Sequence, residues 1–158
     1  MDIDTATKAF LALERIAVVG VSRTGQSPAN HIAKRLRETG HQVFAVNPSG
    51  EVIDGEATYP SLKALPTPVQ GAVVVTTPEQ ARLVAVDAAA SGVEWLWFHQ
   101  GFGPVSYDDE ALRIAHDAGL KVLHVGCPMM YCCPDGFHRC AEAVFRFVGR
   151  IPKEVEGA

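Results

Sequence analysis

Residues Arg15–Ala33 read RIAVVGVSRTGQSPANHIA and combine an apolar run, a glycine and the start of a helix. The run Ile16–Val19 predicts a buried parallel strand, and Gly20 ends it where the chain must turn tightly. Ser27 is a favourable N-cap, and Pro28 suits the first helical position. A strand that turns into a helix N-terminus directs unpaired backbone amides and a partial positive charge at one spot. Such a spot binds phosphate esters, so the stretch predicts a nucleotide-like ligand.

The bulk composition is typical of a globular protein with a single domain over residues 1–158. Hydrophobic residues make up 47% and charged residues 20% of the chain. The formal net charge of −4 argues against a nucleic-acid binder. No apolar run is long enough to span a membrane, and the acidic start MDIDTATKAF does not resemble a secretory signal. We therefore expect a cytoplasmic protein without a membrane partner, in which the four cysteines are reduced thiols or metal ligands.

Apolar, strand-like runs alternate with helix-like segments along the whole chain. The predicted strands are Ile16–Val19, Gln42–Val46, Ala72–Thr76, Glu94–Phe98 and Lys121–Val125. The predicted helices are Asp4–Leu13, Pro28–Thr39, Pro78–Ser91, Tyr107–Ala118 and Phe137–Val148, with a shorter candidate at Ser61–Leu65. Three of these helices are expected to stop at a glycine, namely Gly40, Gly92 and Gly119.

This alternation predicts an α/β protein: a Rossmann-like, doubly wound parallel sheet of about five strands with helices on both faces. Numbering those five strands along the chain, we expect the order 3-2-1-4-5. The crevice then lies beyond the first and fourth strands, at the loops Gly20–Ser27 and His99–Pro104. The closing helix is expected to bury the residues that recur at helical spacing: Phe137, Ala141, Val144, Phe145 and Val148. Because Phe145 and Phe147 point to different faces, that helix also permits a homodimer.

The loop after the first strand is a variant phosphate loop, since only Gly20 and Gly25 of a glycine-rich pattern are present. Ser22 can donate its hydroxyl to a phosphate oxygen, and Arg23 can add a charge-assisted hydrogen bond. Asn47 and Pro48 follow the second strand, where an NAD site would place a carboxylate for the ribose. The neutral Asn47 disfavours NAD and would tolerate a phosphorylated ribose, although Asn-Pro is also an ordinary turn.

The ends of the third and fourth strands carry further candidates. Thr77 reads first as a helix N-cap, with Thr76 and Pro78 beside it on the same rim. Gln100 offers a hydrogen-bond donor and acceptor, and Gly101 lets a ligand approach the backbone. His99 has no carboxylate or nucleophile beside it in sequence, so we predict no catalytic residue.

Cysteine is concentrated near the C-terminus, at Cys127, Cys132, Cys133 and Cys140. Their spacing matches no common zinc or iron–sulfur pattern, so buried or loop thiols are favoured and no metal site is predicted. Met129, Met130 and Tyr131 are expected to pack in the core or along a ligand pocket.

These residues resemble a family of small single-domain CoA-binding proteins, related to the nucleotide-binding domain at the front of the succinyl-CoA synthetase alpha subunit. The likeness runs from about Arg15 to Phe145 and rests on IAVVGVS, GHQVFAVNP, IDGEATYPSL, TTP, WFHQGF and AGLKVLHVGC. It implies a Rossmann-type domain with CoA lying across the strand ends. Two departures are Ser27, where the family often has a basic residue that Arg23 can replace, and the cysteine-rich end of the chain.

The resemblance also implies a role for each matching position. The CoA phosphates would border Gly20, Val21 and Ser22, and the nucleotide end would lie along Asn47 and Pro48. The pocket would be lined by Thr76, Thr77 and Pro78, with Gln100 and Gly101 on its far side. The favoured function is therefore a non-catalytic module that binds CoA or an acyl-CoA. The alternatives are a small NAD(P)-dependent oxidoreductase with His99 as proton donor and a metal or redox protein built on the terminal cysteines.

Overall fold

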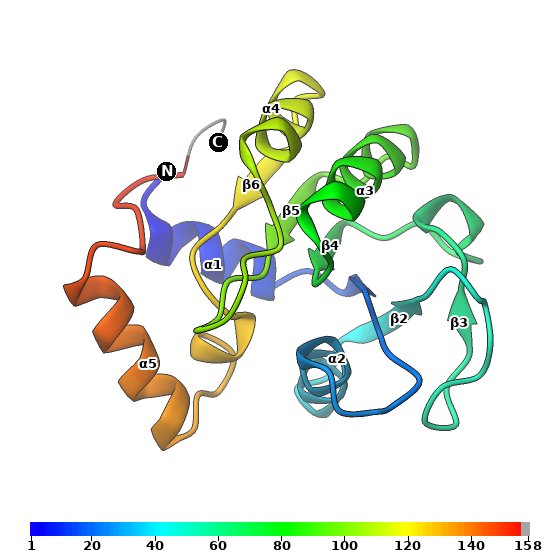
Figure 1. Ribbon diagram of the computed structural model, residues 1–158, viewed down its shortest axis with the longest axis horizontal. Helices are drawn as coiled ribbons and strands as arrows, with labels where there is room; N and C mark the ends of the chain where they lie inside the picture. The colour runs from blue at the N-terminus through cyan, green and yellow to red at the C-terminus, as the bar shows by residue number, and fades with distance from the viewer. Residues whose placement is uncertain (156–158) are drawn as a thin grey trace.

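The computed structural model describes residues 1–155, in which six strands form one parallel sheet in the order β3-β2-β1-β4-β5-β6 (Figure 1). The strands are β1 (Arg15–Val19), β2 (Gln42–Val46), β3 (Thr58–Tyr59), β4 (Gly71–Val74), β5 (Trp95–Phe98) and β6 (Lys121–Leu123). The α-helices are α1 (Ile3–Leu11), α2 (Pro28–Glu38), α3 (Pro78–Ala90), α4 (Asp109–Asp117) and α5 (Gly136–Phe147). Two 3₁₀ turns, η1 (Leu62–Ala64) and η2 (Pro128–Met130), complete the set. The predicted α/β class, with a parallel sheet between helices, is confirmed.

Each face of the sheet has its own hydrophobic core, because successive residues of a strand point to opposite faces. In β1, Ile16 and Val18 pack on the side of α1, α2 and α5, whereas Ala17 and Val19 pack on the side of α3 and α4. Figure 1 shows the two groups of helices on opposite sides of the strands. None of the helices within residues 1–155 is long and apolar enough to cross a bilayer.

The local signals for helix ends are confirmed. The side chain of Ser27 caps α2 and Pro28 begins it, while Thr77 caps α3 in the same way. Gly40, Gly92 and Gly119 follow their helices with positive φ angles of 94°, 73° and 75°. Glycine is favoured there because an L side chain disfavours this left-handed conformation.

The predicted strand order is wrong at one position. The run predicted as Ala72–Thr76 was expected at the edge beside the second strand, but β4 pairs directly with β1, from Ile16–Gly71 to Val19–Val74. The edge position is taken by β3, which has only two residues and therefore shows no apolar periodicity. The reversal of strand order, and with it the expected ligand crevice, lies between β1 and β4.

The predicted burial of the closing helix is also partly wrong. Ala141 and Phe145 are buried, but Phe137, Val144 and Val148 are 66%, 46% and 56% exposed. Helix α5 packs over η2 rather than over the strands, so only a narrow stripe of its surface is covered. Phe147 is 91% exposed, on a different face from Phe145 as expected.

Candidate functional site

Gly20 is required by the packing of the strand ends. Its φ angle is +104°, and a Cβ at this position would overlap the carbonyl oxygen of Val75. The contact arises because the backbone continues to pair beyond β1 and β4: the Gly20 amide donates to Val46 O at 3.1 Å and the Val75 amide to Val19 O at 2.9 Å. This glycine therefore has a structural function whether or not a ligand is bound.

The loop after β1 (residues 20–27) uses many of its backbone amides internally. The amide of Ser22 donates to Asn30 Oδ1 at 2.9 Å, that of Thr24 to Ser22 Oγ and that of Gly25 to Ser22 O. The expectation of a set of unpaired, converging amides is therefore wrong for these positions and for Gly20. Among residues 1–155, the amides of Val21, Arg23, Gln26 and Ser27 have no partner.

The buried Asn30 holds this loop in place from the first turn of α2. Its Nδ2 donates to Ser22 O at 3.0 Å and to Asp54 Oδ2 at 2.9 Å, and its Oδ1 also accepts from Ser27 Oγ at 2.5 Å. Sequence analysis did not single out Asn30, because an Asn three residues after an N-cap is not a recognised motif. A loop fixed by a buried amide offers its surface in one preorganised shape.

Two predicted ligand residues are engaged with the protein itself. Asn47 donates to Val21 O at 2.7 Å and accepts from the Ser49 amide at 2.8 Å, as in an Asx turn. Arg23 forms an exposed ion pair with Glu51 at 3.1 Å. The side chain of Asn47 thus braces the loop after β1, whereas that of Arg23 lies at its solvent-facing tip.

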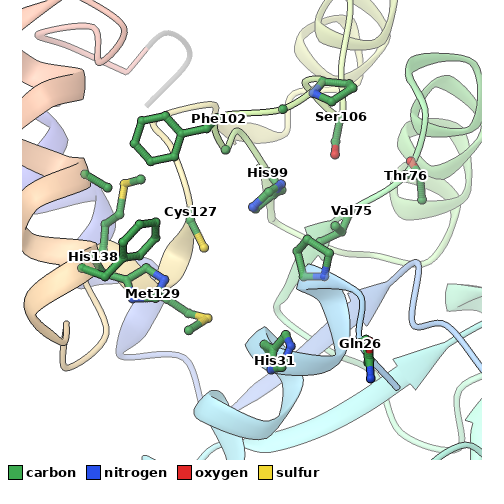
Figure 2. A pocket seen from close by; sticks show the side chains of 17 residues that line it. Gln26, His31, Val75, Thr76, His99, Phe102, Ser106, Cys127, Met129 and His138 are labelled. Atoms are coloured by element: carbon green, nitrogen blue, oxygen red, sulfur yellow. The ribbon is translucent and has the colours of Figure 1, made fainter. Parts of the chain in front are cut away.

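Two cavities lie along the carboxyl edge of the sheet, and Val75 and Thr76 line both. The α5-side cavity, of about 630 Å³, extends from the start of α2 across the loop after β5 to α5 (Figure 2). The α3-side cavity, of about 600 Å³, lies between the ends of β1 and β2 and the first turns of α3. The α3-side cavity is lined by Val19, Gly20, Val46, Pro48, Pro60, Ser61, Leu62, Val75, Thr76, Thr77, Gln80, Leu83, Val84 and Asp87.

Four predicted site residues line the α3-side cavity: Gly20, Pro48, Thr76 and Thr77. Gly101, with Thr76 again, lines the α5-side cavity. The remaining six predicted residues line neither cavity: Val21, Ser22, Arg23, Asn47, Pro78 and Gln100.

Gln100 is buried beside the α5-side cavity, and its Oε1 has no hydrogen-bond partner among residues 1–155. Its backbone amide donates to Gly126 O at 3.4 Å, an oxygen that also accepts from the indole of Trp97 at 2.9 Å. An unpaired buried acceptor is unfavourable unless a water or ligand donates to it. Gln100 therefore remains a candidate for an indirect contact with a bound molecule.

The α5-side cavity holds two titratable groups whose pKa values are changed by burial. Burial lowers the pKa of His99 to about 4 and raises the pKa of the Cys127 thiol to about 11. At neutral pH both groups are therefore uncharged. Figure 2 shows His99 and Cys127 pointing into the same space, with His31 of α2 below them.

Several residues of this cavity were not named as candidates, although Gln26 and Phe102 lie within the loops predicted to form the crevice. Gln26 and His31 flank the start of α2, and Phe102 and Ser106 belong to the loop after β5. The positions of Gln26 and His31 around the start of α2 could have indicated these two residues. No local sequence pattern distinguishes Ser106. Met129 and Met130 line the cavity, as expected for pocket methionines, while Tyr131 packs on Trp97 at 5.5 Å between ring centroids.

The four cysteines occupy different environments as free thiols. Cys127 and Cys132 are buried, whereas Cys133 and Cys140 are exposed. Cys132 lies 3.4 Å from the hydroxyl of Thr39, away from the α5-side cavity. Within residues 1–155, no three His, Cys, Asp or Glu side chains gather as a metal site would require.

Residues 14–132 match the family model described as a CoA binding domain. The match ends before α5, so this helix lies outside the matching region. One curated relative is the alpha subunit of ADP-forming acetate–CoA ligase II from Pyrococcus furiosus, 27% identical over 119 residues. That match covers 71% of this chain but only 26% of the ligase subunit.

Small proteins of similar length also match. An uncharacterized protein of Bacillus subtilis is 26% identical over 110 residues, which are 70% of this chain and 78% of that protein. The solved structure of a hypothetical protein from Pyrococcus horikoshii has a TM-score of 0.73 and 27% identity. The match covers 82% of this chain and 92% of that one.

Proposed function

This chain belongs to the CoA-binding domain family, and we propose that it binds CoA or an acyl-CoA across the carboxyl edge of its sheet. The observation that carries the proposal is the meeting of two cavities at Val75 and Thr76, where the strand order reverses. Ligands of open parallel sheets bind at such a reversal. The shared border of the two cavities suits a long, flexible nucleotide that spans both.

The two cavities suit the two ends of CoA. The α3-side cavity lies beyond β1 and β2, where a Rossmann-like sheet holds an adenosine, and Pro48 and Leu83 give it apolar walls. The diphosphate would cross the ridge near Gly20, with the amides of Val21 and Arg23 and the Arg23 guanidinium as donors. The pantetheine arm would then enter the α5-side cavity past Thr76 and Gly101.

Binding without catalysis fits the chemistry of the site. The Cys127 thiol is a poor nucleophile because burial disfavours its thiolate. His99 has no carboxylate partner among residues 1–155 to orient or activate it. We therefore propose a carrier or sensor of CoA that acts in the cytoplasm. Incubation with acetyl-CoA should release no free thiol above the rate without protein.

Isothermal titration calorimetry with CoA tests the site directly, using two exposed positions of α3. Leu83 lines the α3-side cavity and is 63% exposed, whereas Val86 lines neither cavity and is 55% exposed. Leu83→Glu should weaken CoA binding at least tenfold by repelling the anionic nucleotide, and Val86→Glu should leave it unchanged. Equal affinities for both variants and the wild type would reject this site, and NADPH binding in preference to CoA would favour the oxidoreductase alternative.

The homodimer remains a proposal that this site does not require. The exposed side of α5 carries Val144, Phe147 and Val148, which is an apolar surface of the kind that associates. Sedimentation velocity of the wild type beside Phe147→Ser would reveal a dimer and show whether this surface forms it.

A further inference from the structure

The α5-side cavity is built for an apolar group. Its walls away from the loop backbone are mainly hydrophobic side chains: Phe102, Met129, Met130, Phe137 and Ala141. Phe137 and Ala141 belong to α5, which lies beyond the residues that match the family. The cavity of about 630 Å³ lies in the size range that encloses whole drug-sized molecules. It offers more room than the thiol end of a pantetheine arm requires.

Two buried polar side chains face this apolar space without a partner. His99 and Ser106 are 8% and 4% exposed, and both line the cavity. Neither side chain makes a hydrogen bond to any of residues 1–155; the two are joined only through backbone, Ser106 N donating to His99 O at 3.0 Å. Among residues 1–155, Gln100 Oε1 is the only side-chain polar atom that is fully enclosed and unpaired, so the polar atoms of His99 and Ser106 keep access to the cavity, where a bound acceptor can pair with them.

The donors suit a neutral acceptor. An uncharged imidazole keeps one ring N–H and a serine keeps one O–H, and neither attracts a carboxylate as a cation would. In Figure 2, His99 projects into the cavity from the loop after β5, and Ser106 lies on the same loop. A carbonyl oxygen attached to an apolar chain matches this arrangement of two donors beside a hydrophobic wall.

We propose that the α5-side cavity holds the acyl group of an acyl-CoA, with the thioester carbonyl oxygen accepting hydrogen bonds from His99 and Ser106. This inference rests on the proposed function, because the pantetheine arm must reach the cavity past Thr76. The ligand is then a straight-chain acyl-CoA of several carbons in preference to free CoA. Helix α5 sets this preference, since it supplies the cavity wall farthest from the sheet.

Calorimetric titration with CoA, acetyl-CoA, butyryl-CoA and hexanoyl-CoA tests the apolar wall. We expect the affinity to rise by about threefold to fourfold for each added methylene until the cavity is full. Ala141→Phe should remove this dependence on chain length, so that hexanoyl-CoA binds this variant no more tightly than CoA does. Phe147→Ala is the matched control on the same helix, because Phe147 is 91% exposed and lines no part of the cavity.

A thioether analogue that lacks the carbonyl, S-hexyl-CoA, tests the two donors. The wild type should bind hexanoyl-CoA about fivefold to tenfold more tightly than the thioether, as expected for one or two hydrogen bonds. His99→Ala and Ser106→Ala should each reduce this ratio. A ratio that both variants leave unaltered would overturn the assigned donors.

The outcomes separate this inference from the proposed function. Binding of CoA with the same affinity as every acyl-CoA would overturn the acyl site and leave CoA binding intact. Equal weakening of CoA and hexanoyl-CoA by Ala141→Phe, in a variant with wild-type circular dichroism, would show that Ala141 contacts the pantetheine arm rather than an acyl chain and would also overturn the acyl site. No binding of any CoA species would reject the proposed function together with the inference.

Discussion

The loop after β1 and the loop after β5 border the same crevice but differ in how their polar groups are used. In residues 20–27, the amides of Ser22, Thr24 and Gly25 are satisfied within the loop or by Asn30, whose side chain also holds the Ser22 carbonyl. In residues 99–106, the side chains of His99, Gln100 and Ser106 are buried and have no partner in the described chain. The first loop therefore has a fixed shape, whereas the second has polar side chains that are available to bind a ligand. The recognisable motif lies in the loop that has fewer such side chains.

Gly20→Ala should show most strongly that the first loop is structural. The new Cβ would overlap Val75 O and occupy a φ of +104°, so we expect a loss of at least about 4 kcal/mol of unfolding free energy, or no folded protein. Gly119→Ala is the matched control, because φ is +75° there but nothing lies within 4 Å of the Cβ. It should lose only about 1 kcal/mol.

Urea unfolding followed by circular dichroism measures both glycine variants. Similar losses in the two would show that the close approach of Val75 is relieved at little cost. The first loop would then be free to adjust to its ligand, and its contrast with the second loop would disappear.

The pH dependence of stability tests the second loop through His99. The pKa of His99 is about 4 in the folded protein and 6.5 in the unfolded chain. Between these pH values the unfolded state therefore binds more protons than the folded state. Stability should therefore fall as the pH drops from about 6.5 to 4, by about 3 kcal/mol from this residue alone. His31 and His138 line the same cavity, so the wild type must be compared with His99→Gln, which keeps both.

Urea unfolding of the wild type and His99→Gln at several pH values between 4 and 7 gives the difference. Between pH 6.5 and 4 the wild type should lose about 3 kcal/mol more stability than the variant, since the variant lacks the imidazole that stays uncharged in the folded protein. Parallel curves would mean that His99 is well solvated, and the α5-side cavity would lose its buried donor.

The features that the sequence predicted correctly depend on local backbone chemistry, whereas the features that it missed depend on tertiary packing. The caps at Ser27 and Thr77 and the glycine stops were predictable because they depend on backbone chemistry within one turn. β3 was not predicted, because two residues are too few to show a periodic pattern. Without β3, the strand that is β4 was predicted at the edge of the sheet, although it pairs with β1. The exposed Phe137 shows the limit of helical spacing, which says what can be buried but not what covers it. Ser106 joins the cavity only through the path of its loop.

Asn30→Ala should produce an intermediate effect by loosening the first loop. The substitution removes the partner of the Ser22 amide and carbonyl and leaves Asp54 without its donor, so we expect a loss of about 2 kcal/mol. Thr24→Ala is the control on the same loop, because it removes only an exposed hydroxyl contact with Ser22 and should lose less than about 0.5 kcal/mol. Limited proteolysis should cut within residues 20–27 faster in the Asn30 variant alone, and equal cutting in both would show that Asn30 does not hold the loop.

Arg23 gives the smallest expected effect and separates the exposed tip of the first loop from its braced base. The guanidinium is 68% exposed and pairs with Glu51, so its side chain must exchange one partner for another to reach a phosphate. Arg23→Ala should therefore weaken CoA binding only about twofold, as expected for an exposed charge pair. Glu51→Gln should strengthen binding by a similar factor, since it frees the guanidinium while keeping the shape of residue 51. Added salt should shrink both changes, because exposed charges are screened. If both variants weaken binding, the ion pair acts by holding the loop in place, and the tip belongs with the structural part of the loop rather than with the ligand.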